Sequence, residues 1–195
     1  LDKIKDDGTF DQSTQIVLNE VDSLKTLVNE FSSFARLPEI EQVPDSLNDI
    51  IIEASNLFRA AHEKIQFELN LDEQIGTMAL DRAQLKRALI NLFDNAVAAM
   101  DGQGKIVVTT WRDPKSGMLR LDVADEGCGI AGGAYSQLFE PYFSTKAGGT
   151  GLGLAIVQRI IADHGGFVRA QANVPKGTRF LIELPESLLS RKELT

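Results

Sequence analysis

Five short segments of this chain alternate apolar and polar residues, and four of them form two consecutive pairs. The pairs are 106–110 with 119–123 and 167–172 with 178–184, with turn-forming residues at 113–117 and 175–177 between the partners. Alternation with a period of two is typical of a strand with one buried face, and two such strands joined by a short loop predict a β-hairpin. The fifth segment, 65–71, predicts another half-buried strand. A sheet built mostly from hairpins, with one face to be covered, is therefore expected.

Three helices are expected on that face of the sheet. They span about 46–61, 81–100 and 152–164. The first opens with Ser46 and Asp49, three residues apart as in a capping box, and the second opens in the same way at Asp81. Helices gathered on one face of a mixed, mostly antiparallel sheet give an α+β fold, so we predict a two-layer α/β sandwich.

The first 40 residues follow a different pattern. Apolar residues recur in steps of four and three, the heptad spacing of helices that pack into bundles. They are Val17, Val21, Leu24, Val28, Phe31 and Ala35. We expect a helix over 12–37 that ends before Pro38, preceded within residues 1–10 by the end of another helix and a turn at 6–8. One helix cannot bury this stripe alone, so its partner is expected upstream or in another chain.

The composition excludes several classes of function. A net charge of −8 disfavours nucleic-acid binding, because the phosphate backbone needs a basic surface. One cysteine excludes an internal disulfide, and two distant histidines beside it do not predict a zinc site. No apolar run approaches the roughly 20 residues of a membrane span, so we expect a cytoplasmic segment whose only link to a membrane would be an upstream anchor. A nucleotide remains compatible, because backbone amides, Mg²⁺ and a lysine can neutralise its phosphates.

Three clusters of residues carry candidate chemistry, and each is ambiguous by itself. Asn91 and Asn95 lie one helical turn apart on one face, where their amide oxygens suit a phosphate-bound Mg²⁺, although surface asparagines look the same. Asp125 follows a predicted strand and precedes Gly127 and Gly129. Its carboxylate can accept a hydrogen bond from an exocyclic amino group, and the glycines admit a flat ring, although an ordinary turn has the same composition.

The third cluster is the glycine-rich stretch that opens the last helix. Gly149, Gly151 and Gly153 lie at the N-terminus of this helix, where backbone N–H groups and the helix dipole form an anion site. Eight of the 16 glycines fall within 127–153, which predicts a mobile lid from which Lys146 reaches phosphate. The sequence context fits neither the dinucleotide-binding fingerprint nor a Walker-type loop.

Together and in this order, the clusters resemble the motifs of the sensor histidine kinases of two-component systems. The N box corresponds to 91–96, the first glycine box to 125–129, the F box to 139–146, the second glycine box to 149–154 and the late glycine motif to 177–180. The resemblance extends over roughly 46–184 and implies the Bergerat ATP-binding sandwich of the GHKL (HATPase) group, which gyrase and MutL-type ATPases share. The helix 12–37 is most similar to the second dimerisation helix of nitrogen-regulation NtrY-type kinases.

This resemblance assigns a role to each matching residue. Asn95 would hold Mg²⁺, with Asn91 beside it at the phosphates, and Asp125 would bind the adenine amino group. The other ATP-binding residues that the resemblance implies are Gly127 and Gly129 in the adenine pocket, and Lys146, Gly149, Thr150, Gly151, Leu152 and Gly153 in the lid.

The resemblance also implies an activity, cofactors and partners. The γ-phosphoryl group of Mg²⁺–ATP would pass to a histidine and then to an aspartate of a response regulator, here of the NtrX-like type. Residues 1–40 would be the remnant of the dimerisation and phosphotransfer hairpin, which makes the parent protein a homodimer, and 41–190 would be the ATP-binding catalytic domain.

Neither histidine is expected to be the phosphoacceptor. His62 is placed in a surface turn between a helix and a strand, and His164 at a helix end, whereas the acceptor of the family lies on the first bundle helix. The acceptor histidine is therefore expected to be missing from this chain, which should not phosphorylate itself.

Three alternatives remain. They are an anti-sigma-type serine kinase, an ATP-driven clamp of the gyrase type, and a non-catalytic module that binds a nucleotide or a partner. The F box and the heptad helix disfavour the first two, and a phosphotransfer assay separates the third from an active kinase.

Overall fold

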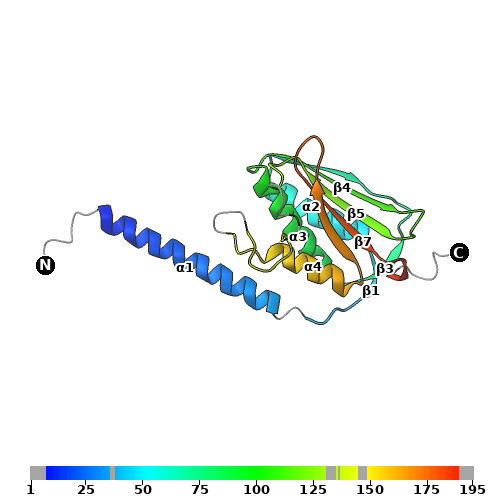
Figure 1. Cartoon of the computed structure of the whole chain (residues 1–195), viewed down its shortest axis with the longest axis horizontal. Helices are drawn as coiled ribbons and strands as arrows, with labels where there is room; N and C mark the ends of the chain where they lie inside the picture. The colour runs from blue at the N-terminus through cyan, green and yellow to red at the C-terminus, as the bar shows by residue number, and fades with distance from the viewer. Residues whose placement is uncertain (1–7, 36–37, 131–134, 136, 145–148, 189–195) are drawn as a thin grey trace.

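A five-stranded sheet with three helices on one face forms the main part of the structure, and a fourth helix extends away from it (Figure 1). The computed structural model describes residues 8–35, 38–130, 135, 137–144 and 149–188. The helices are α1 (Gly8–Ala35), α2 (Leu47–Ala61), α3 (Arg82–Ala99) and α4 (Gly153–Asp163), and a short 3₁₀ helix follows at Glu186–Leu188. Within the described ranges, no helix is both long and apolar enough to cross a membrane.

The main sheet has the strand order β2-β4-β5-β7-β6. The strands are β2 (Ile65–Asn70), β4 (Gly104–Arg112), β5 (Leu119–Asp125), β6 (Phe167–Ala172) and β7 (Thr178–Leu184). Both predicted hairpins, β4–β5 and β6–β7, are present and antiparallel, and only β2 runs parallel to its neighbour β4. The predicted fold class, a two-layer α/β sandwich with a mixed and mostly antiparallel sheet, is confirmed.

A second sheet of two strands was not predicted. It pairs β1 (Val43–Ser46) with β3 (Thr77–Leu80) in antiparallel register. Each strand has four residues, too few to show an alternating pattern. Arg82 anchors β1 by donating hydrogen bonds of 2.7 and 2.6 Å to the carboxylate of Asp45, and this contact lowers the pKa of Asp45.

The helices α2 and α3 begin where the sequence predicts. Ser46 is the N-cap of α2 and accepts a hydrogen bond from the N–H group of Asp49 at 3.2 Å. Asp81 is the N-cap of α3 and accepts one from the N–H group of Gln84 at 3.0 Å. Each cap satisfies one of the backbone donors that the first helical turn leaves without a partner inside the helix.

We expect Ser46→Ala to lower the free energy of unfolding by about 1 kcal/mol, because alanine offers no acceptor to the first turn of α2. Urea unfolding of both proteins measures the difference. Glu63→Ala, at an exposed position just after α2, serves as the control and should change stability by less than about 0.5 kcal/mol. Equal stability of Ser46→Ala and the original protein would contradict the capping role.

The apolar stripe predicted on α3 faces the core and fixes this helix. Its buried members are Leu85, Leu89, Leu92, Ala96 and Met100. The fully buried ring of Phe93 meets Phe58 and Phe67 edge-to-face, with centroid distances of 5.4 and 5.0 Å. Because these rings belong to α2 and β2, α3 is held against both, and Asn91 and Asn95 remain half-buried at the edge of the core.

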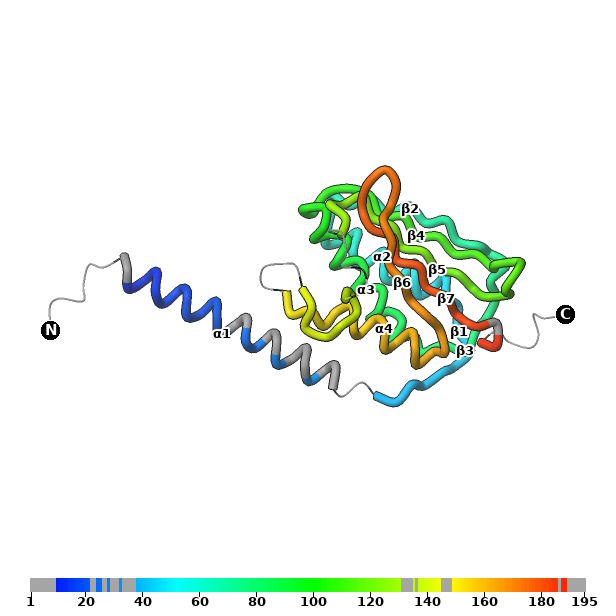
Figure 2. Tube along the Cα trace, viewed as in Figure 1, coloured from blue at the N-terminus to red at the C-terminus, as the bar shows by residue number. Residues whose placement is uncertain are grey.

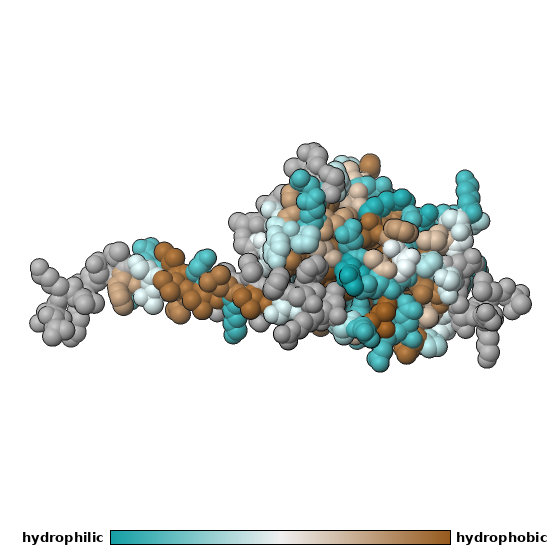
Figure 3. Space-filling view, turned by 60° about the horizontal axis from the view of Figure 1, so that its bottom comes forward, coloured by the Kyte–Doolittle hydropathy of each residue, from teal (hydrophilic) through white to brown (hydrophobic). Residues whose placement is uncertain are grey.

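The helix α1 begins at Gly8, four residues before the predicted start at residue 12. The expected turn at 6–8 is therefore wrong at Gly8, which is helical. Residues 1–7 and 36–37 lie outside the described part, and so does the predicted helix end at Leu37. The described apolar residues of α1 are 53% to 65% exposed, and Figure 3 shows them as an apolar surface along the helix. They are Phe10, Ile16, Val17, Leu18, Val21, Leu24 and Val28. Large apolar side chains gathered on one exposed surface in this way are typical of an interaction site.

The segment between α1 and β1, traced in Figure 2, is held by the start of α3. The side chain of Gln84 donates to the carbonyl of Pro38 at 3.2 Å, and the N–H group of Glu41 donates to Asp81 Oδ2 at 3.0 Å. The buried ring of His164, at the end of α4, accepts from the N–H group of Asp81 through Nε2 at 3.1 Å. Linker, α3 and α4 therefore meet at one hydrogen-bonded junction.

Candidate functional site

A cavity of about 510 Å³ lies between α3, the end of β5, the start of β7, and the described part of 138–154. Asn91 and Asn95 form its α3 wall, and Asp125 lies in its wall at the end of β5. The loop before α4 closes a further side with Gly149, Thr150 and Gly151, and the first residue of α4, Gly153, lies beside them. Residues far apart in sequence thus converge on a concave space of the size that holds a small ligand.

The side-chain amide of each of the two asparagines is held by the backbone of α3. Asn91 Nδ2 donates to the carbonyl of Arg87 at 3.1 Å, and Asn95 Nδ2 donates to the carbonyl of Asn91 at 2.9 Å. Because each nitrogen donates to the preceding turn, the oxygen is the atom of each amide that suits a ligand. A Cβ atom on Gly153 would lie 3.0 Å from Asn91 Oδ1, so the glycine leaves room for this amide.

Asp125 is 3% exposed and is held in one orientation. Its Oδ1 accepts two backbone hydrogen bonds, from Gly127 at 2.8 Å and from Thr178 at 3.1 Å. Its own carbonyl accepts a hydrogen bond from Asn173 Nδ2 at 2.8 Å. A carboxylate fixed in this way at the cavity wall can accept a hydrogen bond from a ligand without rearranging.

The glycines after β5 bring the backbone close to α3. A Cβ atom on Gly127 would lie 2.7 Å from the carbonyl oxygen of Ala99, and the N–H group of Cys128 donates to the same oxygen at 3.0 Å. Gly129 has a φ of +75° and lines the cavity, whereas Gly127 lies behind the wall. The single cysteine, Cys128, is exposed and also lines the cavity.

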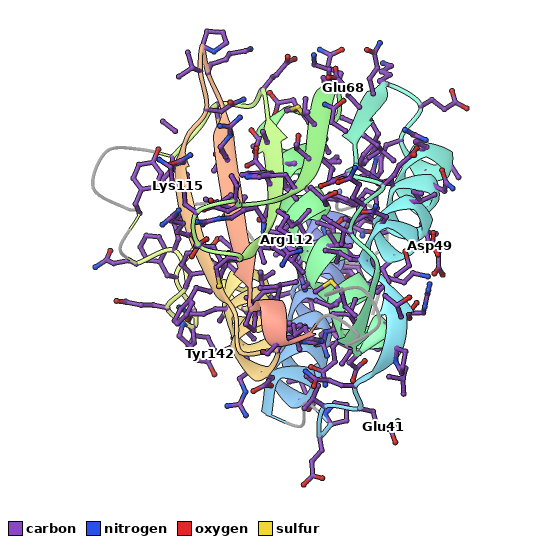
Figure 4. All side chains as sticks on the ribbon, turned by 90° about the vertical axis from the view of Figure 1, so that its right-hand side faces the viewer. Glu41, Asp49, Glu68, Arg112, Lys115 and Tyr142 are labelled. Carbon is purple, nitrogen blue, oxygen red and sulfur yellow. The ribbon has the colours of Figure 1, made fainter. Side chains whose placement is uncertain are left out.

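Gly151 allows the loop before α4 to pass close to the segment 139–143. Its φ is +70°, and a Cβ atom there would lie 2.5 Å from the backbone of Tyr142. The N–H group of Tyr142 donates to the carbonyl of Gly151 at 3.1 Å, while the Tyr142 side chain lies at the surface (Figure 4). The loop thus places the N-terminus of α4, with its partial positive charge, at the cavity.

Ion pairs on the other face of the sheet join β7 to both of its neighbours, β5 and β6. Arg179 Nε lies 3.1 Å from Asp122 Oδ2, and Arg169 lies 2.8 Å from Glu183, which also contacts Arg120. Burial raises the pKa of Asp122, and the Arg179 guanidinium partly opposes this shift. These contacts keep the start of β7 in register with the end of β5, where Thr178 meets Asp125.

The cavity contains most of the predicted site residues. Asn91, Asn95, Asp125, Gly129, Gly149, Thr150, Gly151 and Gly153 line it together. Leu152 does not, because it is fully buried as the N-cap residue of α4. Lys146 and most of the predicted lid, 131–134, 136 and 145–148, lie outside the described residues.

Sequence reasoning missed several residues of the lining. Asp94 and Ala98 line the cavity beside the asparagines. They follow Asn91 by three and seven residues, so the helical period gives the signal that could have found them. Leu138, Ser144 and Leu154 also line the cavity, and they carry no comparable signal. No group of three or more His, Cys, Asp or Glu that could hold a metal occurs in the described part of the chain.

Comparison with known proteins identifies one family. Residues 80–188 match the histidine kinase-, DNA gyrase B- and HSP90-like ATPases. The chain is 34% identical over 181 residues to the signal transduction histidine-protein kinase AtoS of Escherichia coli K12, covering 92% of this chain and 30% of AtoS. It is 33% identical over 187 residues to the nitrogen regulation protein NtrY of Azorhizobium caulinodans, covering 92% of this chain and 24% of NtrY. The chain thus spans less than a third of either relative.

Solved structures with the same fold include two histidine kinases. Full-length ShkA in complex with AMPPNP superposes with a TM-score of 0.74 at 32% identity, covering 89% of this chain and 38% of ShkA. ThkA in complex with the response regulator protein TrrA gives 0.73 at 29% identity, covering 95% of this chain and 54% of ThkA.

Proposed function

This chain belongs to the histidine kinase-, DNA gyrase B- and HSP90-like ATPase family, in its sensor histidine kinase branch, and from this premise we propose that its cavity binds Mg²⁺–ATP for phosphoryl transfer to a histidine. The observation that supports the proposal is the convergence of three groups on one cavity. They are the amides of Asn91 and Asn95, the carboxylate of Asp125, and the glycine loop at the start of α4.

ATP would lie with its base at Asp125 and its phosphates at α4. The carboxylate of Asp125 accepts the hydrogen bond of the 6-amino group of adenine, and the glycine at 129 admits the flat ring. Backbone N–H groups at 149–151 bind phosphate oxygens. The dipole of α4 strengthens this binding. Lys146, which lies outside the described residues, would add a positive charge at the phosphates.

The residues present fit a magnesium ion carried by the nucleotide. An amide oxygen is a hard, neutral ligand, and Asn95, whose Nδ2 is held by the carbonyl of Asn91, lines the cavity. Mg²⁺ is usually held by few protein groups together with phosphates and water, so no acidic cluster is needed. When bound, it neutralises charge on the transferring phosphoryl group. Asn95 would orient the phosphates through this ion, and the glycine loop would position them and exclude water.

The chain divides in this proposal into residues 1–40, a helix of the dimerisation and phosphotransfer hairpin, and 41–190, the catalytic domain. The exposed apolar surface of α1 supports a partner helix and, in the parent protein, a homodimer. A response regulator receives the phosphoryl group, as the complex of ThkA with TrrA suggests by analogy. An NtrX-like regulator remains a proposal, because NtrY and AtoS are nearly equally similar to this chain. We place the parent's catalytic part in the cytoplasm, with any membrane anchor upstream.

Neither histidine of the chain is suited to accept the phosphoryl group. His164 is 1% exposed, and both ring nitrogens are engaged, Nδ1 with the carbonyl of Ile160 at 2.8 Å. His62 ends α2, and its ring stacks on Phe58 at 5.6 Å. We therefore propose that the acceptor lies on a helix that packs against α1.

We expect the chain alone to bind ATP without labelling itself. Incubation with γ-labelled ATP should give no acid-labile label on the chain. Addition of a polypeptide that carries the first bundle helix should give label on that polypeptide.

Label on the chain itself that is lost in His62→Gln would show that His62 is the acceptor. Binding of ATP with no transfer to any supplied helix would instead favour a non-catalytic nucleotide-binding module. Absence of ATP binding would contradict the proposed function itself.

A further inference from the structure

The turn between β6 and β7 packs against the backbone carbonyl of Asp125. Within this turn, the N–H group of Asn173 donates to the carbonyl of Gly177 at 3.0 Å. The Asn173 side chain then reaches out of the turn, and its Nδ2 donates to the carbonyl of Asp125 at 2.8 Å. Asn173 does not line the cavity, so any effect on a bound ligand must pass through Asp125.

The fit between this turn and Asp125 leaves little freedom. Gly177 has a φ of +104°, and a Cβ atom there would lie 1.9 Å from the Asp125 carbonyl oxygen. Next to it, the N–H group of Thr178 reaches Oδ1 of Asp125 at 3.1 Å. The turn therefore holds Asp125 at its carbonyl through Asn173 and at its carboxylate through Thr178. Together these two contacts position both the backbone and the side chain of Asp125.

We propose that Asn173 is a positioning residue that sets the preference of this site for a purine with a 6-amino group. The inference rests on the proposed function, because it assumes that Asp125 contacts the adenine base. A hydrogen bond between a carboxylate and an amino group depends strongly on distance and angle. Loss of the Asn173 hydrogen bond removes the contact that holds the Asp125 carbonyl, while Gly127 and Thr178 still hold Oδ1. The backbone of Asp125 can then shift, and the carboxylate meets the amino group less well. Phosphate contacts at α4 are unaffected.

This arrangement predicts a selective loss of affinity. Asn173→Ala should weaken binding of Mg²⁺–ATP by about 3- to 10-fold, the range of one neutral hydrogen bond. It should leave the affinity for inosine triphosphate unchanged, because that base carries an oxygen in place of the 6-amino group. The ratio of the two affinities therefore falls. A residue with a purely structural role would weaken both nucleotides together and would not change the ratio.

The experiment is calorimetric titration of the chain with both nucleotides in the presence of Mg²⁺. Val174→Ala, in the same turn and 87% exposed, is the matched control and should behave like the original protein. Asn173→Ser, which keeps a shorter donor, should give an intermediate ratio, and it carries the test if Asn173→Ala does not fold. In an Asp125→Asn background, Asn173→Ala should no longer change the ratio, because Asn173 acts through Asp125.

The proposal would be overturned if Asn173→Ala weakened the binding of both nucleotides equally, or weakened the binding of neither, because the ratio of the two affinities would then be unchanged. A change of the ratio that persists in the Asp125→Asn background would also overturn it, because Asn173 would then act on the base by another route. Failure of the original chain to bind either nucleotide would contradict the proposed function, and it is distinguishable because it appears before any substitution is made.

Discussion

Asp125→Asn is expected to weaken the binding of Mg²⁺–ATP by about 5- to 150-fold, which corresponds to a loss of about 1–3 kcal/mol. The substitution preserves shape. The amide oxygen can take over the two backbone hydrogen bonds that Oδ1 accepts from Gly127 and Thr178. The amide nitrogen then occupies the place of the other oxygen and presents a donor to the 6-amino group of adenine, which is also a donor. The site therefore loses recognition of the base while it keeps its packing.

Calorimetry with Mg²⁺–ATP measures this loss, and thermal unfolding checks that the fold is retained. Glu126→Gln is the matched control, because it removes the next carboxylate along the chain, which is exposed and does not line the cavity. It should leave the affinity unchanged. If Asp125→Asn binds ATP as tightly as the original protein does, Asp125 does not contact the base.

Asn95→Ala is expected to weaken Mg²⁺–ATP binding by about 10-fold or more and to abolish transfer to a supplied acceptor helix. The reason is the loss of the amide oxygen that we assign to the metal-bound phosphates. Alanine is a better helix former than asparagine, so unfolding of α3 does not explain a loss of binding. The loss should depend on the metal, and the two proteins should bind ATP with similar, weak affinity when Mg²⁺ is chelated.

Titrations with ATP in the presence of Mg²⁺ and in the presence of a chelator separate a loss of metal-dependent affinity from a loss of affinity for the nucleotide itself. Asn56→Ala, which replaces an exposed asparagine on α2, is the control for the general effect of such a substitution in a helix. A loss of affinity of the same size with and without Mg²⁺ would assign Asn95 to the nucleotide rather than to the metal.

Local signals in the sequence were sufficient for most of the fold. Ser46 and Asp81 carry capping side chains that act within three residues, and the turns of both hairpins lie between strongly alternating segments. For this reason β6 and β7 have the predicted bounds. The pairing of β1 with β3 depends on residues more than 30 positions apart, in strands too short to show a period. The early start of α1 at Gly8 was missed because Asp6, Asp7 and Gly8 together look like a turn.

In the candidate site, too, residues with a local signal were predicted and residues without one were missed. Asn91, Asn95 and the glycines near α4 were found because their spacing follows a helix or a helix N-terminus. Leu152 stands between two glycines that line the cavity, but it is buried in the core, and sequence position alone does not separate these environments. Asn173 gave no signal, because its contact with Asp125 joins residues 48 positions apart and exists only after the sheet has formed.

The hydrogen-bonded junction at the start of α3 also limits the distance between α1 and the α/β sandwich. Gln84 holds the chain at Pro38, and α1 is described as far as Ala35. Three Cα–Cα steps of 3.8 Å separate these two residues, so the tether spans at most about 11 Å. While this anchor holds, the end of α1 cannot lie farther than this distance from the point at which Gln84 holds the chain. In the proposed phosphoryl transfer, the angle between α1 and the sandwich, more than the distance between them, would therefore decide which acceptor the cavity faces.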